Sequence, residues 1–240
     1  PELATYPKIV HGFSTRENGN MSFKWGEAKD VIANRKNFLQ ELKLNPLTGV
    51  SAELMHRDNI VRVGNQEASQ GILQAPSLQA DGLITNEPGI FLMYVVADCL
   101  SILFYDPEHQ AIGLAHAGRQ KSNQTIARAM IQKMTQEFGT NPANLIIGLG
   151  PSIHSCCYGF NQLPNGLDGW TPFIKQKSDR LFYINLVGWY IYELSQSGVA
   201  LENIYLSEHC TAHSGKFFSH FEDLKNKQPE SRFAAVIELK

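Results

Sequence analysis

Residues 97–118, ADCLSILFYDPEHQAIGLAHAG, predict a β-hairpin that carries two side chains capable of binding one metal. Residues 100–105 and 111–115 are apolar runs typical of strands, and Asp106-Pro107 between them is typical of a turn. If the hairpin is centred on Pro107-Glu108, facing residue numbers sum to about 215, as those of Cys99 and His116 do. Cross-strand partners have Cβ atoms roughly 5 Å apart. That separation suits two ligands of one metal, or a thiolate and its base.

The same spacing also fits a buried free cysteine beside a core histidine, and the pattern does not choose between these interpretations. Zinc in enzymes commonly takes three protein ligands and keeps a fourth position open. A third ligand would therefore complete a site. The spacing does not select it among the other histidines, although His109 lies in the predicted turn, at the wrong end of the hairpin.

The rest of the chain alternates between helix and strand patterns, without repeats or linkers. This mixture predicts an α/β or layered α+β fold, with mixed sheets flanked by helices, in a single domain over residues 1–240. Helices are predicted over residues 28–44, 122–138 and 186–196, with Gly139 and Gly198 at the ends of the last two. Further strands are predicted over residues 59–63, 90–96, 145–149, 203–206 and 233–239.

Composition excludes several classes of protein. The net charge is −2 and basic residues form no block or stripe, which argues against nucleic acid as a partner. No apolar stretch is long enough to span a bilayer, and the first ten residues lack a signal-peptide pattern. Two of the four cysteines, Cys156 and Cys157, are adjacent, which disulfide frameworks rarely use. We therefore expect a cytoplasmic protein whose cysteines are free thiols or metal ligands.

Short segments follow one another along the chain in a characteristic order. They are Gly12-Phe13-Ser14-Thr15-Arg16, Asn34-Arg35, Ala80-Asp81-Gly82-Leu83-Ile84-Thr85, Ala97-Asp98-Cys99-Leu100, Ala115-His116-Ala117-Gly118, Gly150-Pro151-Ser152-Ile153, Cys156-Cys157-Tyr158, Phe217-Phe218-Ser219 and Arg232-Phe233-Ala234-Ala235-Val236-Ile237. This series resembles the YfiH family, also called laccase-domain proteins or multicopper polyphenol oxidoreductases. The resemblance covers nearly the whole chain, and the Ala-Asp-Cys and His-Ala-Gly pair is its most specific part. It implies a single layered α/β domain, similar to the deamidase domain of cytotoxic necrotizing factor.

The resemblance also implies a ligand set and an activity. The family's first ligand histidine falls on His56, so the implied zinc site, with copper as the alternative metal, is His56, Cys99 and His116. Family members cleave adenosine or inosine with phosphate, and some deaminate adenosine. The implied partners are a nucleoside and phosphate, with a monomer or small homo-oligomer as the expected assembly. Because arginine binds phosphate through paired donors, the candidate phosphate ligands are Arg16, Arg35, Arg119 and Arg232.

Three other functions stay open. A copper-dependent polyphenol oxidase needs paired His-x-His ligands for its oxygen-reducing cluster, and the sequence has none; residues 209–213 come nearest. A metal-free hydrolase would use Cys99 as nucleophile and His116 as base. A paralogue with weak or no catalysis would keep zinc for structure. The sequence departs from the family pattern at Arg119-Gln120 and His220-Phe221, which predicts an altered pocket.

Overall fold

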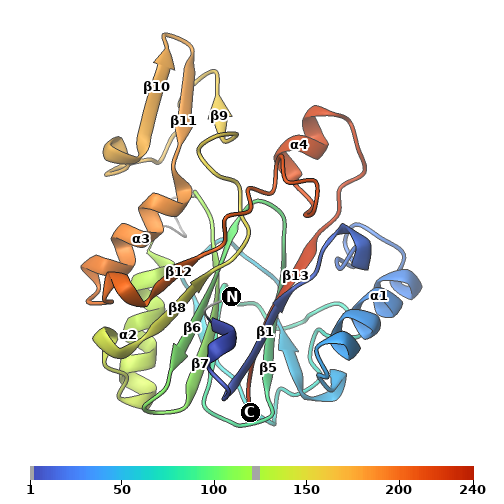
Figure 1. Cartoon of the computed structure of the whole chain (residues 1–240). Helices are drawn as coiled ribbons and strands as arrows, with labels where there is room; N and C mark the ends of the chain where they lie inside the picture. The colour runs from blue at the N-terminus through green and yellow to red at the C-terminus, as the bar shows by residue number, and fades with distance from the viewer. Residues whose placement is uncertain (1–2, 121–124) are drawn as a thin grey trace.

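The computed structural model describes residues 3–120 and 125–240, arranged as four layers: helix, sheet, sheet, helices (Figure 1). Helix α1 (Ala28–Glu41) covers a four-stranded sheet. Helices α2 (Ile126–Phe138) and α3 (Leu186–Gln196) cover a six-stranded sheet, and the two sheets pack face to face. The short helix α4 (His220–Lys225) lies above the layers. No helix in the described ranges is both long and apolar enough to cross a membrane.

The six-stranded sheet contains the predicted hairpin at its centre. Its order is β12-β8-β6-β7-β4-β3, with parallel pairs at both edges and antiparallel pairs between them. The strands are β3 (Ile60–Arg62), β4 (Gly82–Thr85), β6 (Leu100–Asp106), β7 (Ala111–Ala117), β8 (Ile146–Leu149) and β12 (Ile204–Leu206).

The four-stranded sheet has the order β1-β13-β5-β2 and is also mixed, because β2 runs parallel to β5. Its strands are β1 (Ile9–Phe13), β2 (Gly49–Ser51), β5 (Phe91–Val96) and β13 (Phe233–Leu239). Strand β5 is buried on both faces, as its continuous apolar run predicted. Leu92 and Tyr94 pack between the sheets, whereas Phe91 and Met93 pack beneath α1.

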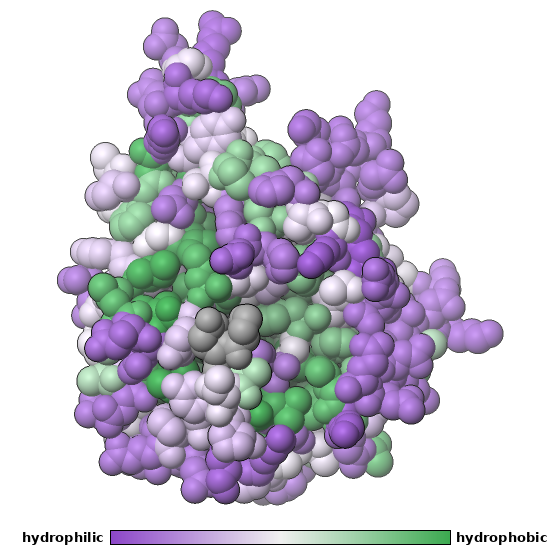
Figure 2. Space-filling view, viewed as in Figure 1, coloured by the Kyte–Doolittle hydropathy of each residue, from purple (hydrophilic) through white to green (hydrophobic). Residues whose placement is uncertain are grey.

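A third, antiparallel sheet forms an arm that projects from the layers (Figure 1). Its strands are β9 (Gly159–Phe160), β10 (Ile174–Ser178) and β11 (Leu181–Ile184). Hydrophilic residues cover the tip of this arm (Figure 2). Short 3-10 helices occur at Leu3–Thr5, Arg16–Asn18, Pro46–Thr48, Pro142–Asn144, Thr171–Phe173 and Leu201–Asn203.

The register of the central hairpin differs from the prediction. Facing residue numbers sum to 217, as in Leu100 opposite Ala117, and not to 215. The turn occupies residues 107–110, because the Asp106 carboxylate accepts hydrogen bonds from the main-chain N–H groups of Glu108 and His109, at 3.0 and 3.1 Å. Cys99 is therefore a diagonal neighbour of His116, which is still within reach of long side chains.

The ends of two predicted helices also need correction. Helix α1 stops at Glu41 and not at residue 44, because Lys43 adopts φ of 59° and the Leu44 N–H donates to the Leu39 carbonyl at 2.9 Å. Helix α2 begins at Ile126, with Thr125 at its N-cap, and residues 122–124 of the predicted helix lie outside the described residues. Gly139, with φ of 78°, ends α2 as predicted, and α3 has the predicted bounds.

Candidate metal site

The structure brings His56, Cys99 and His116 together. One ligand atom from each lies within 4.8 Å of the others. The two imidazole rings meet edge to face, with centroids 4.7 Å apart and an angle of 83° between their planes. His116 is 2% exposed at the end of β7, whereas Cys99 is partly exposed just before β6 and His56 precedes β3. The geometry therefore offers two imidazole nitrogens and one sulfur to a single ion.

Asp81 holds two of these three residues, although the sequence did not single it out as a functional residue. Its Oδ1 lies 2.9 Å from His116 Nδ1 and also accepts the His56 main-chain N–H at 2.9 Å. Its Oδ2 accepts the N–H groups of Met55 and Arg57, both at 3.0 Å. Because an ionised carboxylate only accepts hydrogen bonds, His116 Nδ1 carries a proton and Nε2 is left for a metal. A carboxylate behind a ligand histidine is typical of zinc sites, so this donor set fits zinc.

Cys99 and His116 form a charged pair in the metal-free protein. Burial acts to raise the pKa of the Cys99 thiol, but the charge of His116 and hydrogen bonds from His116 and His56 lower it to about 6. Burial acts in the opposite direction on His116, but the Cys99 thiolate and Asp81 raise its pKa to about 9. Between these values the thiolate, which is the form that binds metal, is already present.

Cys99 opens into a cavity of about 460 Å³, a size typical of small-molecule sites. Arg119 lines it, with Nε donating to the Tyr158 hydroxyl at 3.0 Å and the guanidinium 5.4 Å from the centroid of the Phe160 ring. Tyr158, Phe160 and Phe221 contact one another edge to face. The lining residues are Ala97, Asp98, Cys99, Arg119, Ile153, Tyr158, Phe160, Leu186, His220, Phe221, Leu224 and Lys225.

The cavity therefore includes the positions at which the sequence departs from the family pattern, except Gln120, which is exposed. Asp98 ties the Cys99 loop to α4: its Oδ2 accepts the Phe221 N–H and its Oδ1 accepts the Thr211 hydroxyl, both at 2.6 Å. Burial raises the pKa of this carboxyl group. Asp98 also adopts φ of 76°, so the main chain turns sharply immediately before the candidate ligand.

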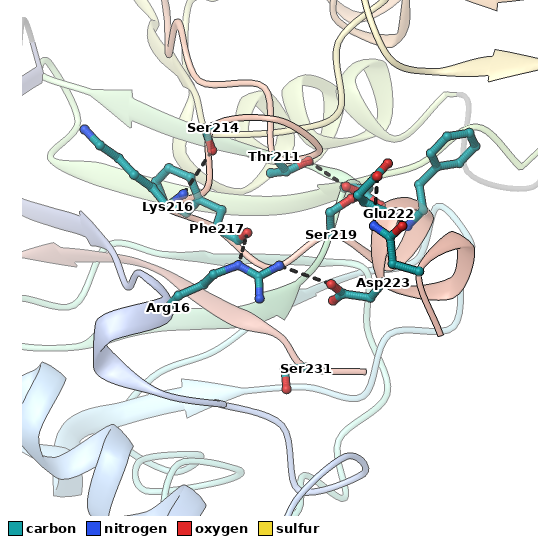
Figure 3. Close-up of polar contacts among 12 residues, drawn as sticks. Arg16, Thr211, Ser214, Lys216, Phe217, Ser219, Glu222, Asp223 and Ser231 are labelled. Carbon is teal, nitrogen blue, oxygen red and sulfur yellow. Dashed lines mark hydrogen bonds and ion pairs between the residues drawn. The ribbon is translucent and has the colours of Figure 1, made fainter. Parts of the chain in front are cut away.

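Two of the arginines predicted to bind phosphate are instead paired with carboxylates on or near α4. Arg16 Nε donates to the Phe217 carbonyl at 2.8 Å, and its guanidinium pairs with Asp223 at 3.1 Å (Figure 3). Arg232 pairs at 2.7 Å with Glu230, which also contacts His220 Nδ1 at 2.9 Å. Neither Arg16 nor Arg232 is among the residues that line the cavity.

Arg35 is not brought to the cavity. It lies on the buried face of α1, is 1% exposed, and its guanidinium donates to the carbonyl oxygens of Met21, Gly71 and Ile72 at 2.6–2.8 Å. The guanidinium N–H groups that we expected to bind phosphate therefore bind main-chain carbonyl oxygens. Of the four arginines predicted from the sequence, only Arg119 lines the cavity beside Cys99.

Comparisons with known proteins agree with this architecture. The family model described as multi-copper polyphenol oxidoreductase laccase matches residues 10–240. Purine nucleoside phosphorylase YlmD of Bacillus subtilis is 29% identical over 238 residues, which span 90% of this chain and 84% of that protein. A purine nucleoside phosphorylase of Bacteroides thetaiotaomicron is 27% identical, over 90% of this chain and 87% of its own.

Solved structures show the same fold. The crystal structure of YlmD from Geobacillus stearothermophilus has a TM-score of 0.89 at 26% identity, over 98% of this chain and 93% of that chain. The crystal structure of the Bacillus licheniformis hypothetical protein YfiH has a TM-score of 0.86 at 26% identity, over 98% of this chain and 94% of that chain. The chain belongs to the YfiH/YlmD family, whose family model is that of the multi-copper polyphenol oxidoreductase laccases.

Proposed function

We propose that this chain catalyses the phosphorolysis of purine nucleosides, adenosine or inosine, with a zinc ion held by His56, Cys99 and His116. One observation carries the proposal: three ligand atoms lie within 4.8 Å of one another, and Cys99 opens into a cavity that also contains Arg119. The names of the curated relatives support the reaction class, since they are purine nucleoside phosphorylases.

Phosphorolysis joins a phosphate oxygen to the sugar carbon, breaks the glycosidic C–N bond and releases the free base. Bound zinc supplies a Lewis acid for a substrate oxygen or nitrogen. Arg119, held by Tyr158, presents planar donors that match a phosphate. The aromatic side chains of Phe160 and Phe221 offer a wall against which a purine ring packs. Asp81 keeps His116 oriented throughout, because its hydrogen bond fixes the ring.

The test is to incubate the protein with adenosine and with inosine, in the presence and absence of phosphate. Phosphate-dependent release of free base and ribose 1-phosphate is expected, and Cys99→Ala should abolish both. Ammonia release from adenosine would show that the same site also deaminates its substrate. Base release without phosphate would show hydrolysis and contradict phosphorolysis. A wild-type rate in the Cys99→Ala variant would place the reaction elsewhere.

Copper-dependent oxidation of phenols is the second candidate, because a ligand set of two histidines and one cysteine also suits copper. The description of the matching family model favours it as well. Copper-loaded protein should then oxidise a phenolic dye, while both nucleosides stay intact. That pair of results would replace our proposal with the oxidase function.

A further inference from the structure

A second group of metal-ligand side chains lies outside the cavity, made of Cys156, Cys157, Cys210 and His213. One ligand atom from each lies within 4.8 Å of the others. His213 Nδ1 is 3.2 Å from the sulfur of Cys157 and 3.7 Å from that of Cys156. Cys210 is 1% exposed, whereas Cys156 and His213 are exposed, so the group is buried at one side and open to solvent at the other.

Main-chain contacts fix the two segments that carry these side chains. Ser152 forms a parallel bridge with Cys210, and the Thr211 N–H donates to the Ser152 carbonyl at 2.9 Å. The His154 N–H donates to the sulfur of Cys210 at 3.4 Å. These contacts hold the two segments together, so the four side chains are already close to one another before any metal ion binds.

We propose that Cys156, Cys157, Cys210 and His213 bind one zinc ion in a closed, structural site. Zinc–sulfur distances of about 2.3 Å and zinc–nitrogen distances of about 2.0–2.1 Å place tetrahedral ligand atoms roughly 3.5–3.8 Å apart. The observed separations of 3.2 and 3.7 Å are close to that range. Three sulfurs and one nitrogen complete four-coordinate zinc and leave no open position for a substrate.

The sequence spacing agrees with this assignment. Cys210 and His213 are separated by two residues, a spacing that zinc sites commonly use. A disulfide would join only two of the three sulfurs and would leave an imidazole beside an unused thiol. Zinc uses all four donors, whereas a disulfide leaves two of them unexplained.

Two of the proposed ligands directly precede residues that hold side chains lining the cavity, so the ion would stiffen the cavity wall. Tyr158, which holds Arg119, follows Cys157 directly. Thr211, whose hydroxyl donates to Asp98, follows Cys210 directly. This inference does not rest on the proposed function, because a structural ion at this place is independent of the reaction next to it.

The experiment counts metal ions in protein purified under reducing conditions and equilibrated with zinc, then with Co²⁺ as a spectroscopic probe. The wild type should hold two ions per chain. Cys99→Ala should hold one, with the strong near-ultraviolet sulfur-to-cobalt bands of a multi-thiolate site. The double variant Cys157→Ser/His213→Asn should hold one and keep only the weaker sulfur-to-cobalt band of the single Cys99 thiolate. His209→Asn, in the same loop as His213, is the matched control and should keep two.

Cys99→Ala alone separates this proposal from the catalytic one, because it removes the other site. Failure of that variant to bind zinc or cobalt would overturn the inference and leave the catalytic proposal standing. A disulfide among Cys156, Cys157 and Cys210, found by mass spectrometry of unreduced peptides, would also overturn it.

Discussion

Asp81 is one buried carboxylate that orients the candidate ligand His116 and anchors the loop that carries the candidate ligand His56. Asp81→Asn keeps the shape, but the new amide NH₂ replaces an oxygen that now accepts two main-chain N–H groups. Loss of such an outer partner typically lowers metal affinity by about 10–100-fold. We therefore expect the zinc dissociation constant to rise by that factor, as measured by competition with a chelator.

Asp106→Asn is the matched control for Asp81→Asn. Asp106 is also buried and contacts a histidine at 2.9 Å, but it lies at the turn end of the hairpin, beside His109. Zinc affinity should not change in this variant. Equal losses in the two variants would mean that general destabilisation, and not the orientation of His116, governs zinc binding.

The reactivity of Cys99 in metal-free protein gives a second prediction. Because its pKa is about 6, the thiol is mostly ionised at pH 7, and alkylation by iodoacetamide should rise with a midpoint near pH 6. Burial and the neighbouring thiols Cys156 and Cys210 raise the pKa of Cys157 to about 12, so that thiol should stay unreactive in this range. Peptide mass spectrometry follows each site. A Cys99 midpoint near pH 9 would show that His116 does not stabilise the thiolate. Bound zinc should protect Cys99 from alkylation at neutral and alkaline pH.

Strand β9 of the arm and helix α4 both contribute to the wall of the cavity, where Phe160 contacts Phe221. Tyr158, just before β9, accepts the hydrogen bond that positions Arg119. Arg119→Gln removes a charge-assisted bond worth roughly 1.5–3 kcal/mol, so the KM for phosphate should rise about ten- to a hundred-fold. Tyr158→Phe removes only the hydrogen bond that positions the guanidinium, and should raise the same KM roughly two- to tenfold. Steady-state assays at varied phosphate measure both.

Arg128→Gln is the control for Arg119→Gln. Arg128 is a half-exposed arginine on α2 that pairs with Glu193 at 3.1 Å, and it does not line the cavity. Its substitution should leave the KM for phosphate unchanged. If Arg119→Gln behaves like Arg128→Gln, phosphate is bound by other cations, and His220 and Lys225 in the cavity wall become the next candidates.

Elements with a strong local pattern were predictable, and those without one were not. Strand β5 has a continuous apolar run and helix α3 has periodic apolar residues. The bounds predicted for these two elements were therefore correct or nearly so. Strand β10 reads Ile-Lys-Gln-Lys-Ser and is exposed, so its partner in the arm, and not burial, makes it a strand. Strands β2 and β4 were not predicted, because each begins with glycine and ends with a small polar residue and so lacks a continuous apolar run.

The two candidate metal groups also differ in how far a local sequence pattern predicts them. Cys99 and His116 are close because a local hairpin joins them, so their proximity was predictable even with the register off by two residues. Cys157 and Cys210 are close because β8 and β12 pair in parallel, with Ile147 opposite Ile204. No local pattern reports a pairing between segments so far apart in the sequence. Asp81 lies in a segment that the family resemblance included, but nothing in the residues alone gave its role.

The topology of the six-stranded sheet explains why the candidate ligand residues gather at one end of its strands. β6 begins where the antiparallel strands β7 and β8 end, and β12 ends beside β8 because those two strands are parallel. Strands β4 and β3 begin at that same end of the sheet. Residues just before β3, β4 and β6, at the end of β7, and just after β8 and β12 therefore meet there, and they include both candidate ligand groups.

A substitution at Arg35 would test whether the contacts of α1 with the rest of the chain serve stability alone. Burial lowers the pKa of its guanidinium to about 10, so it stays charged at neutral pH while it joins α1 to residues 21, 71 and 72. Arg35→Met leaves these carbonyl groups without their donors, at about 1–3 kcal/mol for each unsatisfied group. We expect the free energy of unfolding to fall by roughly 3–5 kcal/mol and Tm by about 10 °C.

That loss is large against a total stability of about 5–15 kcal/mol, and it should leave function almost untouched in the protein that remains folded. Zinc content and the KM for phosphate should match the wild type below the melting transition, since Arg35 is held by main chain under α1 and not at the cavity. Lys36→Met, one residue along and exposed, is the control and should change neither stability nor KM appreciably. A selective rise in the KM for phosphate in Arg35→Met, at unchanged Tm, would instead make Arg35 a ligand of the substrate. Thermal melts and phosphate titrations of the same two variants decide between these roles, because a structural donor changes the first measurement and a substrate ligand changes the second.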